Sequence, residues 1–180
     1  MNIPNFLTAL RILAIPALVV VLLTPFEGRE VTGFAIFLFA SLTDMLDGFF
    51  ARRKKLITVL GQLLDPTADK LLITSAIICL VEIEVVPGWM AIVIIGREIA
   101  VSGFRAIASS RGINIPAGAL GKMKMSVETV TICLLILGKK NLGGLYVLSQ
   151  AGLWLAIFLA VASAVYYYIM YWPQVVSNRA

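Results

Sequence analysis

Six long apolar runs divide the chain, and short polar segments separate them. The runs cover Phe6–Leu23, Val31–Phe50, Leu63–Val81, Trp89–Ala108, Ala119–Leu137 and Leu145–Trp172. A helix needs ~20 residues to cross the hydrocarbon core of a bilayer, and each run approaches or exceeds that length. The pattern predicts an all-α integral membrane protein with six transmembrane helices, built as a single domain over residues 1–180.

The composition agrees with this interpretation. Hydrophobic residues make up 60% of the chain and charged residues 14%, whereas soluble domains have ~45–50% and ~25%. A soluble globular enzyme, a disordered chain and a secreted disulfide scaffold are therefore excluded. The two cysteines, Cys79 and Cys133, lie inside apolar runs and are interpreted as small buried hydrophobic residues. The net charge of +5 is too small and too scattered to indicate a nucleic-acid partner.

Positive charges lie mostly on one side of the predicted membrane. Arg52–Lys55 follows the second run, and four more cations lie between the end of the fourth run and the start of the fifth. Loops rich in lysine and arginine stay on the cytoplasmic side. We therefore expect both termini in the cytoplasm and the protein in the cytoplasmic membrane.

Four aspartates interrupt the second and third runs. Asp44 and Asp47 are three residues apart, and Asp65 and Asp69 are four apart, so each pair shares one face of its helix. A short loop joins the two helices, which makes them antiparallel neighbours. The pairs can therefore face each other just beneath the cytoplasmic surface. Charged residues inside a span cost ~2.5–3.5 kcal/mol each on insertion scales, which indicates a functional site.

Carboxylates gathered at low dielectric repel one another, and they must protonate or bind cations. The chain has no histidine, and a donor set made only of oxygen favours a hard cation such as Mg²⁺, Mn²⁺ or Ca²⁺. Two divalent ions would balance the four charges, and paired ions recur in phosphoryl transfer. Two structural alternatives remain. Asp65, which precedes Pro66, could be a helix N-cap, and Asp44 or Asp47 could pair with a buried arginine.

The spacing of these residues extends into a longer motif. It reads Asp44-x-x-Asp47-Gly48-x-x-Ala51-Arg52, then eight residues, then Gly61-x-x-x-Asp65-x-x-x-Asp69. All eight fixed positions match the signature of the CDP-alcohol phosphotransferases, which the chain resembles. Gly96-Arg97-Glu98, Phe104-Arg105 and Gly121-Lys122-Met123-Lys124 resemble the phosphatidylglycerophosphate synthase branch, although Met125 stands where a hydroxyl residue is expected.

The resemblance implies that an alcohol attacks CDP-diacylglycerol and releases CMP. Asp44, Asp47 and Asp65 would bind Mg²⁺ or Mn²⁺, and Asp69 would complete the metal site and take the proton from the attacking hydroxyl. In this branch the alcohol is sn-glycerol 3-phosphate. A homodimer in the lipid bilayer, with its active site facing the cytoplasm, is a further expectation from the family.

Eight residues are predicted to bind CDP-diacylglycerol, namely Asn5, Thr8, Arg11, Gly48, Ala51, Arg52, Thr58 and Gly61. The small residues among them would let the nucleotide lie against the helices, or they would serve close helix packing instead. Arg11 would meet the pyrophosphate or neutralise an aspartate. Arg52 would pair with a phosphate or act only as a topology anchor. Asn5 could instead cap the first helix, and Thr8 could instead bond to its own helix.

Four cations near the cytoplasmic side are predicted to bind the phosphate of the acceptor, namely Arg105, Arg111, Lys122 and Lys124. Arginine offers a two-pronged set of donors that matches a phosphate. A role limited to topology is the alternative for each of them. Glu98 shares a helix face with Arg105, so Glu98 is expected to orient that arginine.

Three other functions fit parts of the pattern. The same chemistry could use another phosphorylated acceptor, such as inositol phosphate. Intramembrane prenyltransferases also use paired acidic motifs, but they are longer and lack the Gly-x-x-Ala-Arg element. A divalent-cation transporter would also place aspartates inside its helices. From residue 71 to residue 81, however, the third run offers only Thr74 and Ser75 as polar residues on a path to the far side.

Overall fold

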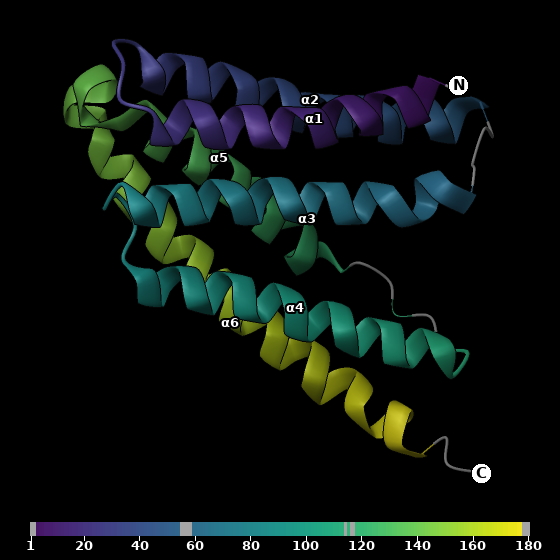
Figure 1. Ribbon diagram of the computed structural model, residues 1–180. Coiled ribbons are helices and arrows are strands. Elements are labelled where there is room, and N and C mark those ends of the chain that lie inside the picture. Colours follow the sequence, from purple (N-terminus) through teal and green to yellow (C-terminus); the bar gives the residue numbers. More distant parts are fainter. Residues whose placement is uncertain (1–2, 55–58, 114, 116–117, 178–180) are drawn as a thin grey trace. The chain divides into compact units, whose positions relative to one another are not determined.

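The computed structural model describes residues 3–54, 59–113, 115 and 118–177, and of these the side chains of 3–7, 44–54, 59–66, 119–120, 122 and 176–177 are not described. Within these ranges the chain forms six α-helices and one short 3₁₀-helix, without a β-strand (Figure 1). They are α1 (Ile3–Leu23), α2 (Arg29–Lys54), α3 (Val59–Glu82), α4 (Gly88–Ser110), α5 (Ala119–Leu142), η1 (Gly143–Leu145) and α6 (Tyr146–Ser177). Every predicted run falls on one α-helix to within a residue, which confirms the all-α fold class.

Helix α5 is interrupted near its end. Gly138 has φ 67° and ψ 174°, a backbone conformation that is open to glycine and unfavourable for other residues. The regular part of α5 therefore ends at Leu137, where the fifth apolar run was expected to end. The exposed lysines Lys139 and Lys140 follow immediately.

The helices form two compact units, each assembled from two stretches of sequence. Unit 1 consists of Met1–Val86 and Ile132–Tyr146, and it contains α1, α2, α3 and the end of α5. Unit 2 consists of Pro87–Thr131 and Val147–Ala180, and it contains α4, the start of α5 and α6. The single domain over residues 1–180 stays a prediction.

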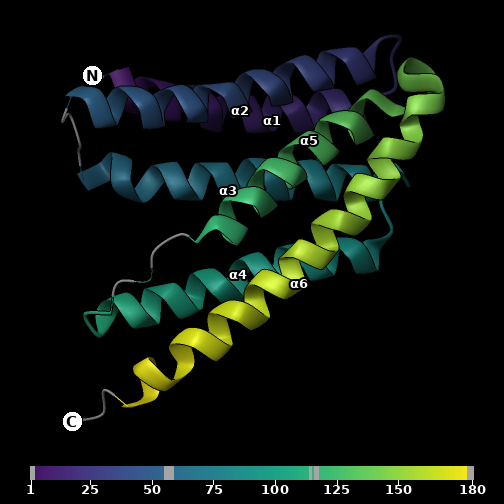
Figure 2. The same cartoon turned by 180° about the vertical axis from the view of Figure 1, so that it is seen from behind.

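In unit 1, α1 packs against both α2 and α3, and α2 also contacts α3 (Figures 1 and 2). The α1–α2 contact is antiparallel, because Leu22 lies beside Gly33 and Arg11 lies beside Ala40. A Cβ atom on Gly33 would lie 2.6 Å from Cδ2 of Leu22, so glycine permits this close approach. Fully buried apolar side chains of all three helices fill the centre of the unit, namely Leu18, Phe37, Ala40, Leu72, Ala76 and Leu80.

Both cysteines belong to unit 1. Cys79 and Cys133 are buried thiols that form no disulfide. This confirms their interpretation as small hydrophobic residues of the interior.

In unit 2, α4 and α6 run parallel to each other (Figure 2). Contacts between the two helices occur in the same order along both of them. From start to end they join Trp89 to Trp154, Arg97 to Ser163, Phe104 to Tyr168 and Arg111 to Val175. Helix α5 runs opposite to α6, because Thr131 lies against Gly152 while the earlier residue Gly118 bonds to the later residue Tyr167. These directions are the ones that alternating membrane crossings require of three consecutive helices.

Large apolar side chains are exposed on helices of both units, among them Leu13 (67%), Ile92 (73%) and Phe158 (67%). Among the residues with described side chains, one helical stretch, Met123–Val175, is long and apolar enough to cross a membrane by length and composition. The apolar helix Thr8–Leu23 is shorter. The six crossings and the cytoplasmic location of both termini stay predictions.

Candidate active site

The acidic motif lies on the adjoining helices α2 and α3 of unit 1. Asp44 and Asp47 lie in α2, and Asp65 and Asp69 lie in α3, so each pair keeps the spacing that places it on one helix face. The side chain of Asp69 is half-buried, and those of the other three lie outside the described residues. Because α3 begins at Val59, Asp65 lies within the helix, and its interpretation as an N-cap is wrong.

Arg11 brings a positive charge to α2 next to this motif. Its side chain is 1% exposed, and its Nε donates a hydrogen bond to the carbonyl oxygen of Ala40 over 3.3 Å. Ala40 lies one helical turn before Asp44. Thr8, one turn before Arg11 in α1, is buried as well. This position is compatible with both predicted roles of Arg11. These are a contact with the pyrophosphate and the neutralisation of an aspartate.

The other residues predicted to bind CDP-diacylglycerol lie near helix ends. Gly48, Ala51 and Arg52 lie in the last turns of α2, Gly61 in the first turn of α3 and Asn5 in the first turn of α1. Because α1 and α2 are antiparallel, the start of α1 lies at the same end of unit 1 as the end of α2 (Figure 1). The side chains of these residues, and the whole of Thr58, lie outside the described residues, so their roles stay predictions.

The predicted metal site also depends on side chains that are not described. Among the side chains that the structure does describe, no group of three or more aspartate, glutamate or cysteine residues could hold a metal ion. Three of the four predicted aspartate ligands lie outside that set. The divalent cofactor therefore stays a prediction.

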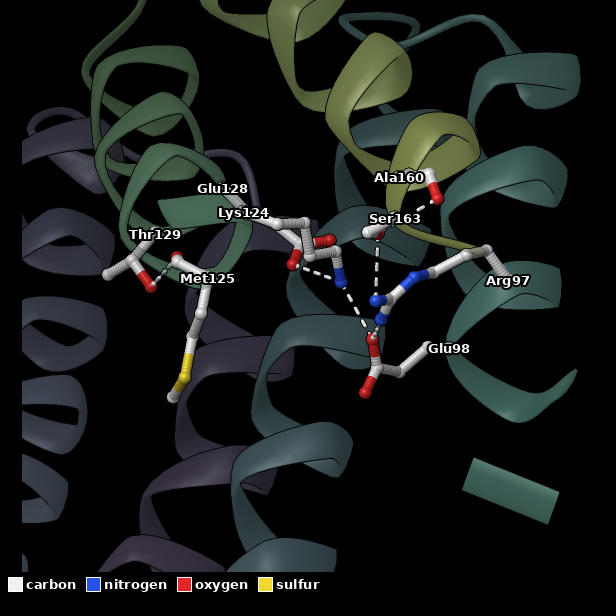
Figure 3. Close-up of polar contacts among 8 residues, drawn as sticks. All are labelled: Arg97, Glu98, Lys124, Met125, Glu128, Thr129, Ala160 and Ser163. Carbon is white, nitrogen blue, oxygen red and sulfur yellow. Dashed lines mark hydrogen bonds and ion pairs between the residues drawn. The ribbon is translucent and has the colours of Figure 1, made fainter. Parts of the chain in front are cut away.

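Unit 2 contains a partly buried charge network that joins α4, α5 and α6 (Figure 3). Oε2 of Glu98 accepts hydrogen bonds from Nη1 of Arg97 and from Nζ of Lys124, each over 2.7 Å. Nζ of Lys124 also lies 2.7 Å from Oε2 of Glu128, and the side chains of both residues are only 6% exposed. Nη2 of Arg97 donates to Oγ of Ser163 in α6 over 3.0 Å. The network thus contains two positive and two negative charges.

The network differs from what the sequence predicts for two residues. The sequence predicts that Lys124 binds the acceptor phosphate, whereas the structure places its ammonium group between two carboxylates. The sequence also predicts that Glu98 orients Arg105, whereas the structure pairs Glu98 with Arg97 and Lys124. The two segments that carry the branch resemblance therefore meet through an ion pair.

The two arginines near the end of α4 are exposed, and each bonds to a backbone carbonyl. Nη2 of Arg105 donates to the oxygen of Ile115 over 3.1 Å, and Nη1 of Arg111 donates to the oxygen of Val175. A guanidinium group has five N–H donors, so one backbone bond leaves donors for a phosphate. The side chain of Lys122, in the first turns of α5, lies outside the described residues.

The hydroxyl of Tyr167 fixes the segment that leads into α5. It accepts a hydrogen bond from the backbone N–H of Gly118 over 2.9 Å, and a Cβ atom on Gly121 would lie 3.3 Å from the same oxygen. Tyr167 is 4% exposed and belongs to a buried cluster with Phe104 and Ile115. The start of the Gly121–Lys124 motif is therefore held against α6.

Reasoning from sequence missed three residues of unit 2, namely Glu128, Ser163 and Tyr167. A signal for Glu128 exists, because opposite charges four residues apart pair on one helix face, and Glu128 is four residues after Lys124. Ser163 and Tyr167 have no such signal, since their partners belong to other helices.

A family model supports the assignment that the acidic motif indicates. The model of the family described as CDP-alcohol phosphatidyltransferase matches residues 1–162. The chain belongs to the CDP-alcohol phosphatidyltransferase family. The resemblance drawn from the motif is therefore confirmed.

Three relatives match this phosphatidyltransferase over nearly the whole of both chains. A protein of Bacillus subtilis is 36% identical over 99% of each chain. A protein of Rickettsia felis is 34% identical over 93% of each chain. A protein of Pseudomonas fluorescens is 34% identical over 97% of this chain and 92% of its own. All three are named CDP-diacylglycerol–glycerol-3-phosphate 3-phosphatidyltransferase.

Proposed function

We propose that this protein transfers the phosphatidyl group of CDP-diacylglycerol to sn-glycerol 3-phosphate, giving phosphatidylglycerophosphate and CMP. One observation carries the proposal. The chain is similar over nearly its full length to enzymes that bear this name, and it places the Asp44–Asp69 motif on two adjoining helices. The enzyme would act as a homodimer that crosses the cytoplasmic membrane six times, with its active site toward the cytoplasm.

The donor set on α2 and α3 fits a pair of divalent metal ions. Its four carboxylates supply only oxygen ligands, and the chain has no histidine, which favours Mg²⁺ or Mn²⁺ over softer ions. Asp44, Asp47 and Asp65 would hold the ions, and Asp69 would complete the site. Such ions, when bound, polarise the phosphoryl oxygens and the attacking hydroxyl.

The proposed reaction is a displacement at phosphorus. The hydroxyl oxygen of glycerol 3-phosphate forms a bond to the phosphorus atom that bears diacylglycerol. The bond from that phosphorus to the oxygen shared with the cytidine phosphate breaks, and CMP leaves with the electron pair. The carboxylate of Asp69 accepts the hydroxyl proton. Arg11, buried beside α2, stabilises the negative charge of the pyrophosphate.

The acceptor is distinguished by its phosphate. Arg105 and Arg111 are exposed near the end of α4, and Lys122 lies in the first turns of α5. Together they would supply the fixed positive charge that a phosphorylated acceptor needs and that serine does not.

The interior of unit 1 argues against a transporter. Leu72, Ala76 and Leu80 continue along one face of α3 beyond Asp69, and all three are fully buried. Their apolar side chains offer no oxygen ligand to an ion that would move past Asp69 toward the other end of the helix.

The test measures CMP release by the purified protein in lipid vesicles that contain CDP-diacylglycerol and Mg²⁺. Glycerol 3-phosphate, inositol phosphate and serine are added separately, and Asp69→Asn is assayed beside the unchanged protein. We expect release only with glycerol 3-phosphate and its loss in Asp69→Asn. Glu82→Gln neutralises an exposed carboxylate at the end of the same helix and should stay active. Release with another acceptor would change the assigned substrate, and no release with any acceptor would overturn the proposal.

A further inference from the structure

Among the described side chains, the charge network of unit 2 joins two cations to two anions. Lys124 lies 2.7 Å from carboxylate oxygens of both Glu98 and Glu128, and Arg97 lies 2.7 Å from Glu98. Oε1 of Glu128 is buried and has no hydrogen-bond partner among the described residues, so Lys124 is the cation that compensates this carboxylate. An ammonium group already shared by the buried carboxylate of Glu128 and the half-buried carboxylate of Glu98 is poorly placed to attract a phosphate.

The network joins the two segments that carry the predicted acceptor cations. Lys124 lies two residues after Lys122 in the opening turns of α5, and Glu98 lies two turns before Arg105 in α4. The contact between Glu98 and Lys124 therefore sets where α5 begins relative to α4. Each buried partner depends on the other, because removal of one leaves an uncompensated charge at low dielectric.

Two further bonds hold the same region. The backbone N–H of Gly118 donates to the hydroxyl of Tyr167 over 2.9 Å, and Arg105 donates to the carbonyl of Ile115 over 3.1 Å. The backbone that leads into α5 and through its opening turns is thus held at three points by α4 and α6. A backbone held in this way has less conformational freedom to lose when a ligand binds, which lowers the cost of binding.

We propose that Lys124 and Glu128 are a positioning pair, linked to α4 through Glu98, that orients the opening turns of α5 for the acceptor phosphate. The inference rests on the proposed function, because it assigns the pair to the acceptor side of that reaction. It revises the predicted role of Lys124. Lys122 and Arg105 bind the phosphate, and Lys124 acts through the backbone that carries Lys122.

A comparison of an unbalanced variant with a charge-balanced one distinguishes a positioning role of Lys124 from a role in binding the phosphate. Lys124→Met leaves the carboxylates of Glu98 and Glu128 with Arg97 as the remaining cation of the network. The double variant Lys124→Met/Glu128→Gln removes one cation and one anion together, and it leaves the balanced pair of Arg97 and Glu98. The KM values for glycerol 3-phosphate and for CDP-diacylglycerol are measured separately on the full-length protein in vesicles. Lys139→Met, which removes an exposed lysine from the same helix, is the control.

We expect Lys124→Met to raise the KM for glycerol 3-phosphate about tenfold or more, with the KM for CDP-diacylglycerol changed less than about twofold. In the double variant the KM for glycerol 3-phosphate should return to within about threefold of the value for the unchanged protein, because the charge balance is restored. If Lys124 instead binds the phosphate, the double variant stays as impaired as Lys124→Met, and the proposal is overturned. An unchanged KM in Lys124→Met contradicts it equally.

Should Lys124→Met fail to fold, the double variant decides alone: a KM for glycerol 3-phosphate close to that of the unchanged protein supports the positioning pair, and a large rise refutes it. An unchanged protein that releases no CMP with any acceptor refutes the proposed function. An active protein whose double variant stays impaired refutes only the positioning role.

Discussion

Units 1 and 2 place charged residues in apolar helices in different ways. In unit 1, α2 and α3 carry the four aspartates of the motif, and the buried Arg11 reaches α2 one turn before the first of them. In unit 2, two cations pair with two anions, namely Arg97 and Lys124 with Glu98 and Glu128. At its fixed positions the motif of unit 1 carries four aspartates and one cation, Arg52, whereas the network of unit 2 has two charges of each sign.

This difference predicts which charged residues bind ligands and which ones hold helices in place. Excess charge of one sign at low dielectric requires compensation from outside the motif, such as bound cations. A balanced network is complete without a ligand. Changes to the motif of unit 1 should therefore act mainly on catalysis, and changes to the network of unit 2 mainly on positioning and stability.

The largest effect is expected from Asp69→Asn in unit 1. This change removes the carboxylate proposed to accept the hydroxyl proton, so kcat should fall ~10²–10⁴-fold. It also removes one negative charge from the motif of four aspartates, so the thermal unfolding midpoint, measured without metal, should stay the same or rise. Rates of CMP release and unfolding curves from one preparation test both statements. A variant that is inactive because it unfolds would break the contrast between the units.

The next largest effect is expected from Arg11→Met. Loss of the buried guanidinium should raise the KM for CDP-diacylglycerol by about 10–100-fold, with little change for glycerol 3-phosphate. Arg11→Lys should stay impaired, because an ammonium group lacks the planar set of donors. Arg29→Met is the control, since Arg29 makes a partly exposed pair with Glu30, 3.5 Å away, and such pairs contribute little. Full activity of Arg11→Lys would show that charge alone is needed.

Gly33→Ala should lower stability without a selective effect on either substrate. The new Cβ atom would lie 2.6 Å from Leu22 at the α1–α2 contact, and overpacking of this kind costs ~1–3 kcal/mol. Gly103→Ala is the control, because nothing lies within 4 Å of its Cβ position in α4. It should be neutral or slightly stabilising, as alanine favours a helix. Equal unfolding midpoints for the two variants would contradict the close approach of α1 and α2.

Much of the fold could be predicted from the sequence, because an apolar run has a clear length and clear ends. The end of α5 at Leu137 is an example, since Gly138 interrupts the helix where the run stops. The acidic motif was equally clear, because its spacing is local and each pair lies within one helix. The family followed from that spacing and was confirmed by the match over residues 1–162.

The roles of individual cations could not be predicted in the same way. Lys122 and Lys124 are two residues apart in one motif, and nothing in the sequence separates them. The structure distinguishes their roles through packing, because Glu98 of α4 lies beside Lys124. Long-range partners such as Ser163 follow from which faces of α4 and α6 pack together and in which register, and a single sequence does not reveal either.

The smallest expected effect tests the acceptor side of the comparison. Tyr167→Phe removes the hydroxyl that accepts the N–H of Gly118 and keeps the buried ring. Loss of one such bond costs ~0.5–1.5 kcal/mol, so the KM for glycerol 3-phosphate should rise by about two- to tenfold, with the KM for CDP-diacylglycerol unchanged. Tyr166→Phe changes an exposed neighbour and should have no effect.

A second substitution makes this test sharper. Gly121→Ala places a Cβ atom 3.3 Å from the Tyr167 hydroxyl, a tight contact that should also raise the KM for glycerol 3-phosphate. In the Tyr167→Phe background that oxygen is gone, so the effect of Gly121→Ala should be smaller than in the unchanged protein. The coupling of the two changes measures how far the position of the α5 start controls acceptor binding. Additive effects would mean that the hydroxyl of Tyr167 and the Gly121–Lys124 motif act independently, and the unit 2 residues would then stabilise the fold without orienting the site.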